Sequence, residues 1–176
     1  MAGIDETIEF QPVHIAVMTV SDTRTEETDT SGPLLADRLR KAGHILAEKI
    51  IVRDEQAEIE AALRRWIADD EVEVVLATGG TGVTGRDVTP EAFHAVYEKE
   101  IPGFGELFRM LSYELIKTST IQSRATAGVA GGTYLFALPG STGACRDAWD
   151  QILVHQLDIR HKPCNFAELL PRLREY

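Results

Sequence analysis

The sequence predicts an α/β domain with three layers, in which an open, mostly parallel sheet carries helices on both faces. Strand-like and helix-like segments alternate along the 176 residues, as expected when helices connect parallel strands. Segment 72–77 is a short apolar run bounded by turn residues, which is typical of a strand buried on both faces. Glycines follow its carboxyl end, where the ligands of such sheets bind.

Apolar runs mark the expected strands, which cover residues 13–20, 45–52, 72–77 and 133–138. The first strand leads through a polar loop to a helix that Thr30 or Ser31 would cap and that would end before Gly43. Residues 128–132 are expected to form a turn between short strands, because glycines and small residues weaken any regular element there.

Helical spacing of apolar residues marks the connecting segments. Asp54 is expected to cap the second helix, in which Ile59, Leu63 and Trp66 recur on one face. Thr89-Pro90 begins another helix, with proline at the first helical position. Two further stripes are expected, one over Phe104, Leu107, Phe108 and Leu111, and one over Cys145, Ala148, Trp149, Ile152 and Leu153. The first of these stripes is either core or a subunit interface.

Composition limits the classes of protein to which the chain can belong. The formal net charge of −10 argues against a nucleic-acid partner, which would require a clustered basic face. No apolar run is long enough to cross a membrane, so we expect a cytoplasmic protein. Two cysteines are too few for a disulfide framework or a metal cluster. Residues 1–11 are acidic and are expected to be a flexible tail, and residues 12–176 to be a single domain.

The glycine segment after the third strand is the main candidate binding element. It reads Thr78-Gly79-Gly80-Thr81-Gly82, and its uncovered N–H groups suit an anionic oxygen such as phosphate. Asp87 follows close enough to face the same ligand, where a carboxylate can hold Mg²⁺ against phosphates. A dinucleotide fingerprint is excluded, because the glycines do not open a helix directly. Arg86, Arg109 and Arg124 are the cations expected to meet an anion.

Polar residues also follow the other strands. Ser21 and Asp22 follow the first, Asp54 the second, and Pro139, Gly140 and Ser141 the strand at 133–138. Taken singly, Asp22 is as readily a turn residue, and Asp54 and Ser141 are more readily helix caps. Because the carboxyl ends of parallel strands share one edge of the sheet, we expect these loops to converge on one crevice.

The chain resembles a known family at these positions. Segments 78–82, 86–92, 102–106, 123–125 and 138–142 are similar to the molybdenum-cofactor biosynthesis group that includes molybdopterin adenylyltransferase and biosynthesis protein B. The similarity runs from about Val13 to Asn165. It implies a molybdopterin-binding-like fold and a single molybdopterin-binding domain over residues 12–176.

The resemblance also implies an activity, in which AMP is moved from ATP onto the terminal phosphate of molybdopterin. Asp87 and Asp54 would then be catalytic and would hold Mg²⁺ with the triphosphate. Ser21, Asp22 and the segment Thr78, Gly79, Gly80, Thr81 and Gly82 would bind the nucleotide. The pterin side, including its phosphate, would be held by Ser123, Arg124, Pro139, Gly140 and Ser141.

Two other functions agree with the same resemblance. Some relatives look like non-catalytic proteins that keep the fold and bind molybdopterin, and a third reading is a scaffold for another enzyme of the pathway. Retention of Asp22, Asp54 and Asp87 favours catalysis. The resemblance further implies a homo-oligomer, either a trimer or a hexamer.

Overall fold

The protein forms a six-stranded sheet with strand order β3-β2-β4-β7-β6-β5 in a computed structural model that describes residues 2–175. The strands of this sheet are β2 (His14–Val20), β3 (Ile45–Val52), β4 (Val74–Thr78), β5 (Lys99–Glu100), β6 (Thr126–Ala130) and β7 (Thr133–Leu138). Strands β3, β2, β4 and β7 are mutually parallel, β6 runs antiparallel to β7, and β5 runs antiparallel to β6. The predicted mostly parallel sheet is therefore confirmed.

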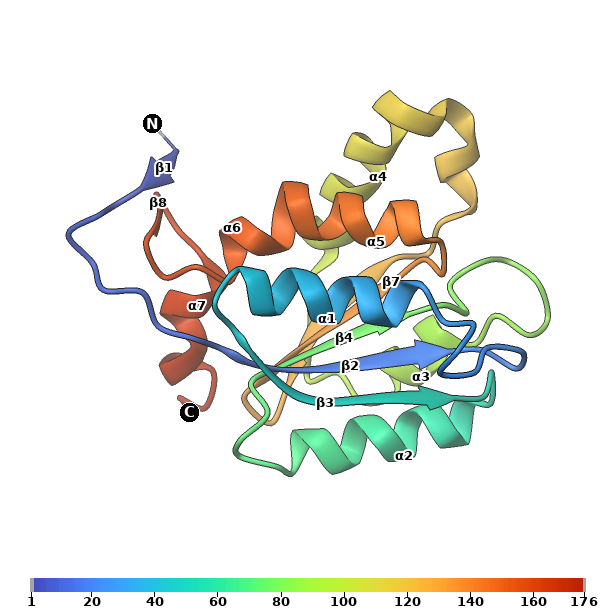
Figure 1. The fold of residues 1–176 in the computed structure, drawn as a ribbon. Helices are drawn as coiled ribbons and strands as arrows, with labels where there is room; N and C mark the ends of the chain where they lie inside the picture. Colours follow the sequence, from blue (N-terminus) through green and yellow to red (C-terminus); the bar gives the residue numbers. More distant parts are fainter. Residues whose placement is uncertain (1, 176) are drawn as a thin grey trace.

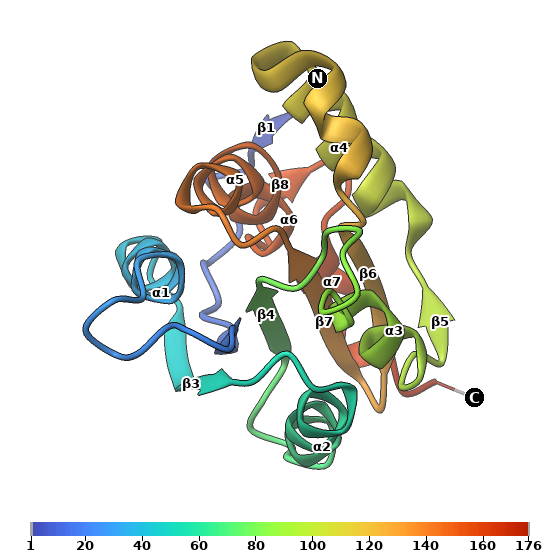
Figure 2. The same ribbon diagram turned by 90° about the vertical axis from the view of Figure 1, so that its right-hand side faces the viewer.

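Helices cover both faces of this sheet, which gives the three predicted layers (Figure 1, Figure 2). One face carries α1 (Ser31–Lys41) and α5 (Thr142–Ala148), while α2 (Gln56–Ile67) and α3 (Thr89–His94) cover the other. Helix α4 (Pro102–Ile116) packs on β6 at its beginning and then extends away from the body, and the 3-10 helix η1 (Lys117–Gln122) folds back from its end.

Alternation along each strand divides the core between the two faces. On β2, Ile15 and Val17 contact the side of α1, α4 and α5, whereas Ala16 and Met18 contact the side of α2 and α3. The same alternation holds along β4 and β7. These central strands are buried on both faces, which explains why their sequences are continuous apolar runs instead of alternating ones.

The amino ends of two helices differ from the prediction. Neither Thr30 nor Ser31 caps α1 through its side chain, because the buried Asp29 accepts the N–H groups of Ser31 and Gly32, each at 3.1 Å. Asp54 does not cap α2 either, since it accepts a hydrogen bond from a different loop, as described below. Gly43 does end α1, with φ of +93°.

The segment at 126–132 also differs in detail. Thr126–Ala130 is a complete strand, β6, and only Gly131 and Gly132 form the turn to β7, both with positive φ. β5 and β6 were not predicted as strands, because they are short and β6 consists of small residues. β5 forms one border of the sheet, and β3 forms the other.

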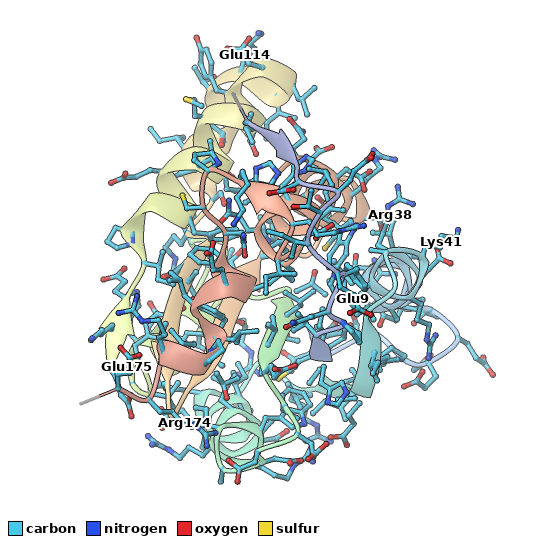
Figure 3. The ribbon with its side chains drawn as sticks, turned by 90° about the vertical axis from the view of Figure 1, so that its left-hand side faces the viewer. Glu9, Arg38, Lys41, Glu114, Arg174 and Glu175 are labelled. Carbon is cyan, nitrogen blue, oxygen red and sulfur yellow. The ribbon has the colours of Figure 1, made fainter. Side chains whose placement is uncertain are left out.

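Both termini pack against the domain. The last long helix is interrupted by a π turn at Trp149–Leu153 before α6 (Val154–Gln156), and α7 (Phe166–Leu169) follows. Phe166 lies 4.9 Å, centroid to centroid, from the ring of Tyr134, so the segment docks on β7. The segment expected to be a tail carries β1 (Gly3–Ile4), which pairs with β8 (His161–Lys162). Figure 3 shows Arg174 and Glu175 far from Glu114, which lies near the outer end of α4.

The buried His44 should make folding stability depend on pH. Its Nδ1 accepts the Val13 N–H at 3.1 Å, and burial lowers its pKa from 6.5 to about 4, although Asp158 opposes the shift. Between these values the unfolded chain binds a proton that the folded chain excludes, so stability falls as pH falls from 6.5 to about 4. We expect a loss of about 3 kcal/mol from this group.

Urea unfolding at several pH values checks this expectation with His44→Asn, whose Oδ1 can accept the same N–H but does not titrate. The variant should lose the extra slope between pH 6.5 and 4, so any deficit in its stability relative to the unaltered protein should shrink as the pH falls through this range. Equal slopes in both proteins would contradict it.

Candidate functional site

Loops from four parallel strands meet at the carboxyl edge of the sheet, which faces the viewer in Figure 2. From β2 the chain connects to β3 on one side of β2 and then to β4 on its other side. The order of strand connection therefore reverses between β2 and β4. Ligands of open α/β sheets bind at such a point. Ser21 and Asp22 leave β2 there, and Thr78 ends β4.

The glycine loop passes the ends of β2 and β7 without room for side chains. Gly79 has φ of +104°, and a Cβ there would lie 2.2 Å from the carbonyl oxygen of Val20. A Cβ on Gly140 would lie 3.2 Å from the Cα of Gly79. Thr78 is fully buried and donates its hydroxyl to the carbonyl of Pro139 at 2.9 Å, so it joins two loops and does not line an open surface.

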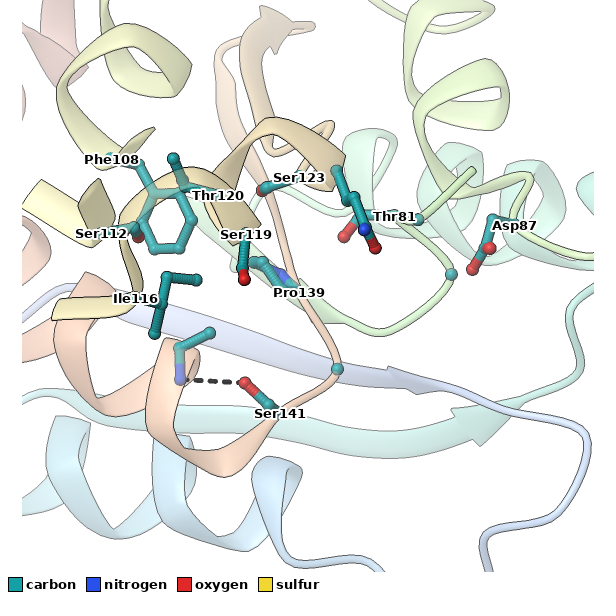
Figure 4. Close-up of a pocket in the computed structure, with 15 residues that line it drawn as sticks. Thr81, Asp87, Phe108, Ser112, Ile116, Ser119, Thr120, Ser123, Pro139 and Ser141 are labelled. Carbon is teal, nitrogen blue, oxygen red and sulfur yellow. Dashed lines mark hydrogen bonds between the residues drawn. The ribbon is translucent and has the colours of Figure 1, made fainter. Parts of the chain in front are cut away.

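A cavity of about 370 Å³ opens beside this loop (Figure 4). Eight of its lining positions are sequence-predicted site residues: Gly80, Thr81, Gly82, Asp87, Ser123, Pro139, Gly140 and Ser141. Figure 4 shows Thr81 and Asp87 at one end and Phe108, Ser112 and Ile116 at the other. Four separate segments therefore contribute to one site, and its size suits a small-molecule ligand.

The far wall of this cavity was not predicted. It is built by α4 and η1 and consists of Phe108, Ser112, Ile116, Ser119, Thr120 and Gln122. The apolar Phe108 and Ile116 lie beside three hydroxyl groups, an arrangement that fits a planar ligand with polar edges. The cluster Thr118-Ser119-Thr120 was the available sequence signal, but nothing in its spacing indicates that η1 folds back over the glycine loop.

Two acidic side chains approach the glycine loop. A Cβ built on Gly80 would lie 3.0 Å from Oδ1 of Asp54, and one built on Gly82 would lie 2.8 Å from Oδ2 of Asp87. Burial raises the pKa of Asp54, and the charges of Asp22 and Asp87 act in the same direction. The structure thus brings together the two carboxylates that the sequence singled out.

Asp87 differs electrostatically from Asp54. Burial acts to raise its pKa, but the hydrogen bonds that it accepts outweigh this and leave the pKa below its ordinary value. Its donors are the Thr84 hydroxyl at 2.6 Å, the Thr84 N–H at 2.8 Å, and the Gly82 N–H. Asp87 is therefore held ionised and fixed in direction at the rim of the cavity.

Asp22 and Asp54 both lie outside the cavity lining and form a network with each other. The Asp22 N–H donates to Oδ2 of Asp54 at 2.8 Å, and the Asp54 N–H donates to Oδ1 of Asp22 at 3.2 Å. Arg86 then contacts Asp22 through two nitrogens and pairs with Glu55. Ser21 accepts N–H groups of Thr23 and Arg24, so it closes its own turn.

None of the three arginines expected to meet an anion is among the residues lining the cavity, as far as residues 2–175 show. Arg86 is engaged with Asp22 and Glu55, and Arg109 donates to the carbonyl of Ala125. Arg124 holds the glycine loop from behind, where it borders a second cleft. The cavity instead presents main-chain atoms and hydroxyl groups, among them that of Ser141. The Ser141 hydroxyl also caps α5, because it accepts the Ala144 N–H.

Comparison with known proteins identifies the family of this chain. The family described as "Probable molybdopterin binding domain" matches residues 16–159, which include every strand of the sheet except the first two residues of β2. The chain belongs to this family. The resemblance seen in the sequence is thereby confirmed.

Individual relatives cover nearly the whole chain. Molybdenum cofactor biosynthesis protein B of Escherichia coli K12 is 55% identical over 158 residues, which are 90% of this chain and 93% of the relative. A crystal structure of molybdenum cofactor biosynthesis protein B has a TM-score of 0.85 at 42% identity, covering 94% of this chain and 98% of that one. The tungsten cofactor synthesizing protein of Pyrococcus furiosus has a TM-score of 0.77 at 35% identity, covering 94% and 99%.

Within residues 2–175, every helix of this chain is too short or too polar to span a lipid bilayer.

The close approach at Gly79 predicts a large difference between two glycine substitutions in the same loop. Gly79→Ala places a Cβ against the Val20 carbonyl in a left-handed conformation, and should destabilise the protein by about 2 kcal/mol or more. Gly85→Ala is the matched control, because a Cβ there meets nothing within 4 Å, and should change stability by less than about 0.5 kcal/mol. Chemical denaturation measures both, and equal effects would contradict the described packing.

Proposed function

We propose that this protein acts in molybdenum cofactor biosynthesis, binds molybdopterin, and transfers AMP from MgATP to the terminal phosphate of molybdopterin. The observation behind the proposal is that Asp87 lines a cavity built from four segments, while Asp54 approaches the same glycine loop from outside that lining. Family membership and the relatives' names support molybdopterin as the ligand.

The reaction needs positioning and charge neutralisation more than covalent catalysis. An oxygen of the pterin phosphate attacks the α-phosphorus of ATP, a new P–O bond forms, and the bond to the departing pyrophosphate breaks. Binding both substrates in one cavity supplies the alignment of attacking and leaving oxygens. Main-chain donors at Gly80 and Thr81 would stabilise the charge that shifts onto the phosphate oxygens.

The chain's donors suit a metal that arrives with the nucleotide. Among residues 2–175 no group of three or more acidic, histidine or cysteine side chains forms a metal-binding cluster. Mg²⁺ commonly takes one or two carboxylates and completes its coordination with substrate phosphates and water. Asp54 and Asp87 would supply those carboxylates, whereas Asp22 is neutralised by Arg86 and would instead orient Asp54.

The pterin is assigned to the opposite wall. Phe108 and Ile116 offer apolar contact for a planar ring, and Ser112, Ser119, Ser123 and Ser141 offer hydrogen bonds to its polar edge and phosphate. The nucleotide would then lie toward Asp87, where Ser21 and Asp22 border the approach only indirectly. Pro139 and Gly140 would separate the two ligand regions.

A binding-only protein is the second candidate, and one observation favours it. Arg86 is already ion-paired with Asp22 and Glu55. Within residues 2–175, no arginine lines the cavity to neutralise a triphosphate. Incubation with molybdopterin, ATP and Mg²⁺ decides between the two, because only an adenylyltransferase releases pyrophosphate and forms the adenylated pterin. A scaffold protein would bind neither ligand.

Asp87 provides the sharpest test of catalysis. Asp87→Asn keeps an oxygen to accept from Thr84 but removes the charge, so AMP transfer should fall by about a hundredfold or more while molybdopterin binding persists. Asp70→Asn is the matched control, because Asp70 precedes the opposite end of β4 and pairs at the surface with Arg174. Adenylated pterin is quantified by chromatography, and full turnover in Asp87→Asn would remove this carboxylate from the mechanism.

Self-association is a further part of the proposed function, with a trimer or hexamer as the assembly. Phe104 and Phe108 of α4 are core residues, but Leu107, Met110 and Tyr113 of the same helix are 40–61% exposed. Helix α4 extends away from the body, so this stripe is free to pack against another copy (Figure 1).

Charge on that stripe should therefore lower the assembled mass. We expect Leu107→Glu with Met110→Glu to shift the species seen by light scattering toward the monomer, because burying two carboxylates in an apolar interface is strongly unfavourable. Leu169→Glu, at a comparably exposed leucine on α7, should leave the mass unchanged. A monomeric unaltered protein would contradict the proposal directly.

A further inference from the structure

Arg124 joins the two ends of the loop that carries Asp87. Its Nε donates to the carbonyl of Gly82 at 2.6 Å, and its Nη2 donates to the carbonyl of Asp87 at 2.7 Å. Its own N–H donates to the carbonyl of Thr81 at 3.0 Å. One residue at the start of the β6 segment therefore closes residues 82–87 into a fixed ring.

The remaining nitrogen of this guanidinium is paired as well. Nη1 contacts Glu91 in the first turn of α3, and this hydrogen bond is the main cause of the lowered pKa of Glu91. The positive charge is thus neutralised on the side away from the cavity, where Arg124 borders the second cleft. An anion in the main cavity would meet the loop and not this cation.

The loop itself has little other support. Val83 is 68% exposed, and a Cβ on Gly85 would have nothing within 4 Å, so the tip stands in solvent. Inside the ring, Thr84 holds the Asp87 carboxylate by its N–H and hydroxyl. The direction of that carboxylate consequently depends on the shape of the ring, and the ring depends on Arg124.

We infer that Arg124 is a positioning residue, which does not contact the ligand but fixes the 82–87 loop so that Asp87 faces the cavity. This replaces the direct contact with the pterin phosphate that the sequence suggested for Arg124. The consequence for turnover rests on the proposed function, whereas the consequence for loop order does not.

Lysine cannot replace arginine in this role. A guanidinium presents several N–H groups in a rigid plane and can bridge two carbonyls while pairing with a carboxylate, whereas an ammonium group is a single point of charge. If Arg124 only supplied charge to a phosphate, Arg124→Lys would largely preserve function. If it positions the loop, Arg124→Lys should behave like Arg124→Gln.

Arg174 offers a matched control at the opposite end of the sheet. Its Nε donates to the carbonyl of Gly131 at 3.0 Å and its Nη1 pairs with Asp70 at 2.7 Å, so it also holds a glycine turn by a guanidinium–carbonyl contact. Arg174→Gln therefore removes the same kind of interaction without touching the 82–87 loop.

Amide hydrogen exchange of the full-length protein without ligand gives the first readout. In Arg124→Gln and Arg124→Lys we expect exchange in residues 82–88 to rise by about tenfold or more, because the amides of Thr84 and Asp87 lose the closed ring that protects them. Arg174→Gln should leave this segment unchanged. Unaltered exchange in both Arg124 variants would overturn the inference.

Ligand binding and turnover give the second readout. We expect both Arg124 variants to retain molybdopterin affinity within about twofold while the rate constant for AMP transfer at saturating substrate falls by about tenfold or more. If Arg124→Gln lost molybdopterin affinity by tenfold and Arg124→Lys restored it, the inference would be overturned in favour of direct phosphate contact. If the unaltered protein transfers no AMP, the proposed activity fails, and the exchange and affinity measurements still decide the role of Arg124.

Discussion

Close backbone packing at Gly79 is the constraint on which the site depends. The parallel register of β2, β4 and β7 brings their carboxyl ends to one edge, but the loops can meet only because Gly79 carries no side chain against the Val20 carbonyl and Gly140 carries none against Gly79. With the three chain segments in contact, the glycine loop is forced outward past Asp54 and toward η1. The cavity is thus the space left between a tightly packed strand edge and a helix that folds back over it.

Each loop at this edge is held by the side chains of another loop. The N–H groups of Asp22 and Asp54 each donate to the carboxylate of the other residue, and the Ser31 hydroxyl donates to the carbonyl of Gly140 at 2.9 Å. Such cross-bracing fixes the site before any ligand binds, which lowers the entropic cost of binding and of reaching a reactive geometry. The same bracing explains why acidic residues can gather at one edge of a strongly acidic protein, since much of their charge is balanced locally by Arg86 and by N–H donors.

Local sequence patterns predicted the parts of the fold that depend on local chemistry. The apolar run before Thr78 predicted β4, and the glycines after it predicted the loop, because burial and positive φ each require particular residue types. Strand β6 escaped prediction, since a residue as small as Gly128 fits this strand because Tyr97 packs closely over it. The place of Ser119 in the cavity wall, and the hydrogen bond that draws Asp54 away from the amino end of α2, escaped for another reason: each is set by a partner far away in the chain, which no spacing rule reveals.

Strand β3 has a consequence for the behaviour of the folded protein in concentrated solution. As the border of the sheet over residues 45–52, it leaves one row of main-chain amides and carbonyls without a strand partner within residues 2–175. Glu48, bound by Arg65 and the Trp66 indole, and Lys49, paired with Glu26, place fixed charges along that row. An incoming strand would have to desolvate these charges, so the border resists the edge-to-edge polymerisation that exposed sheets invite.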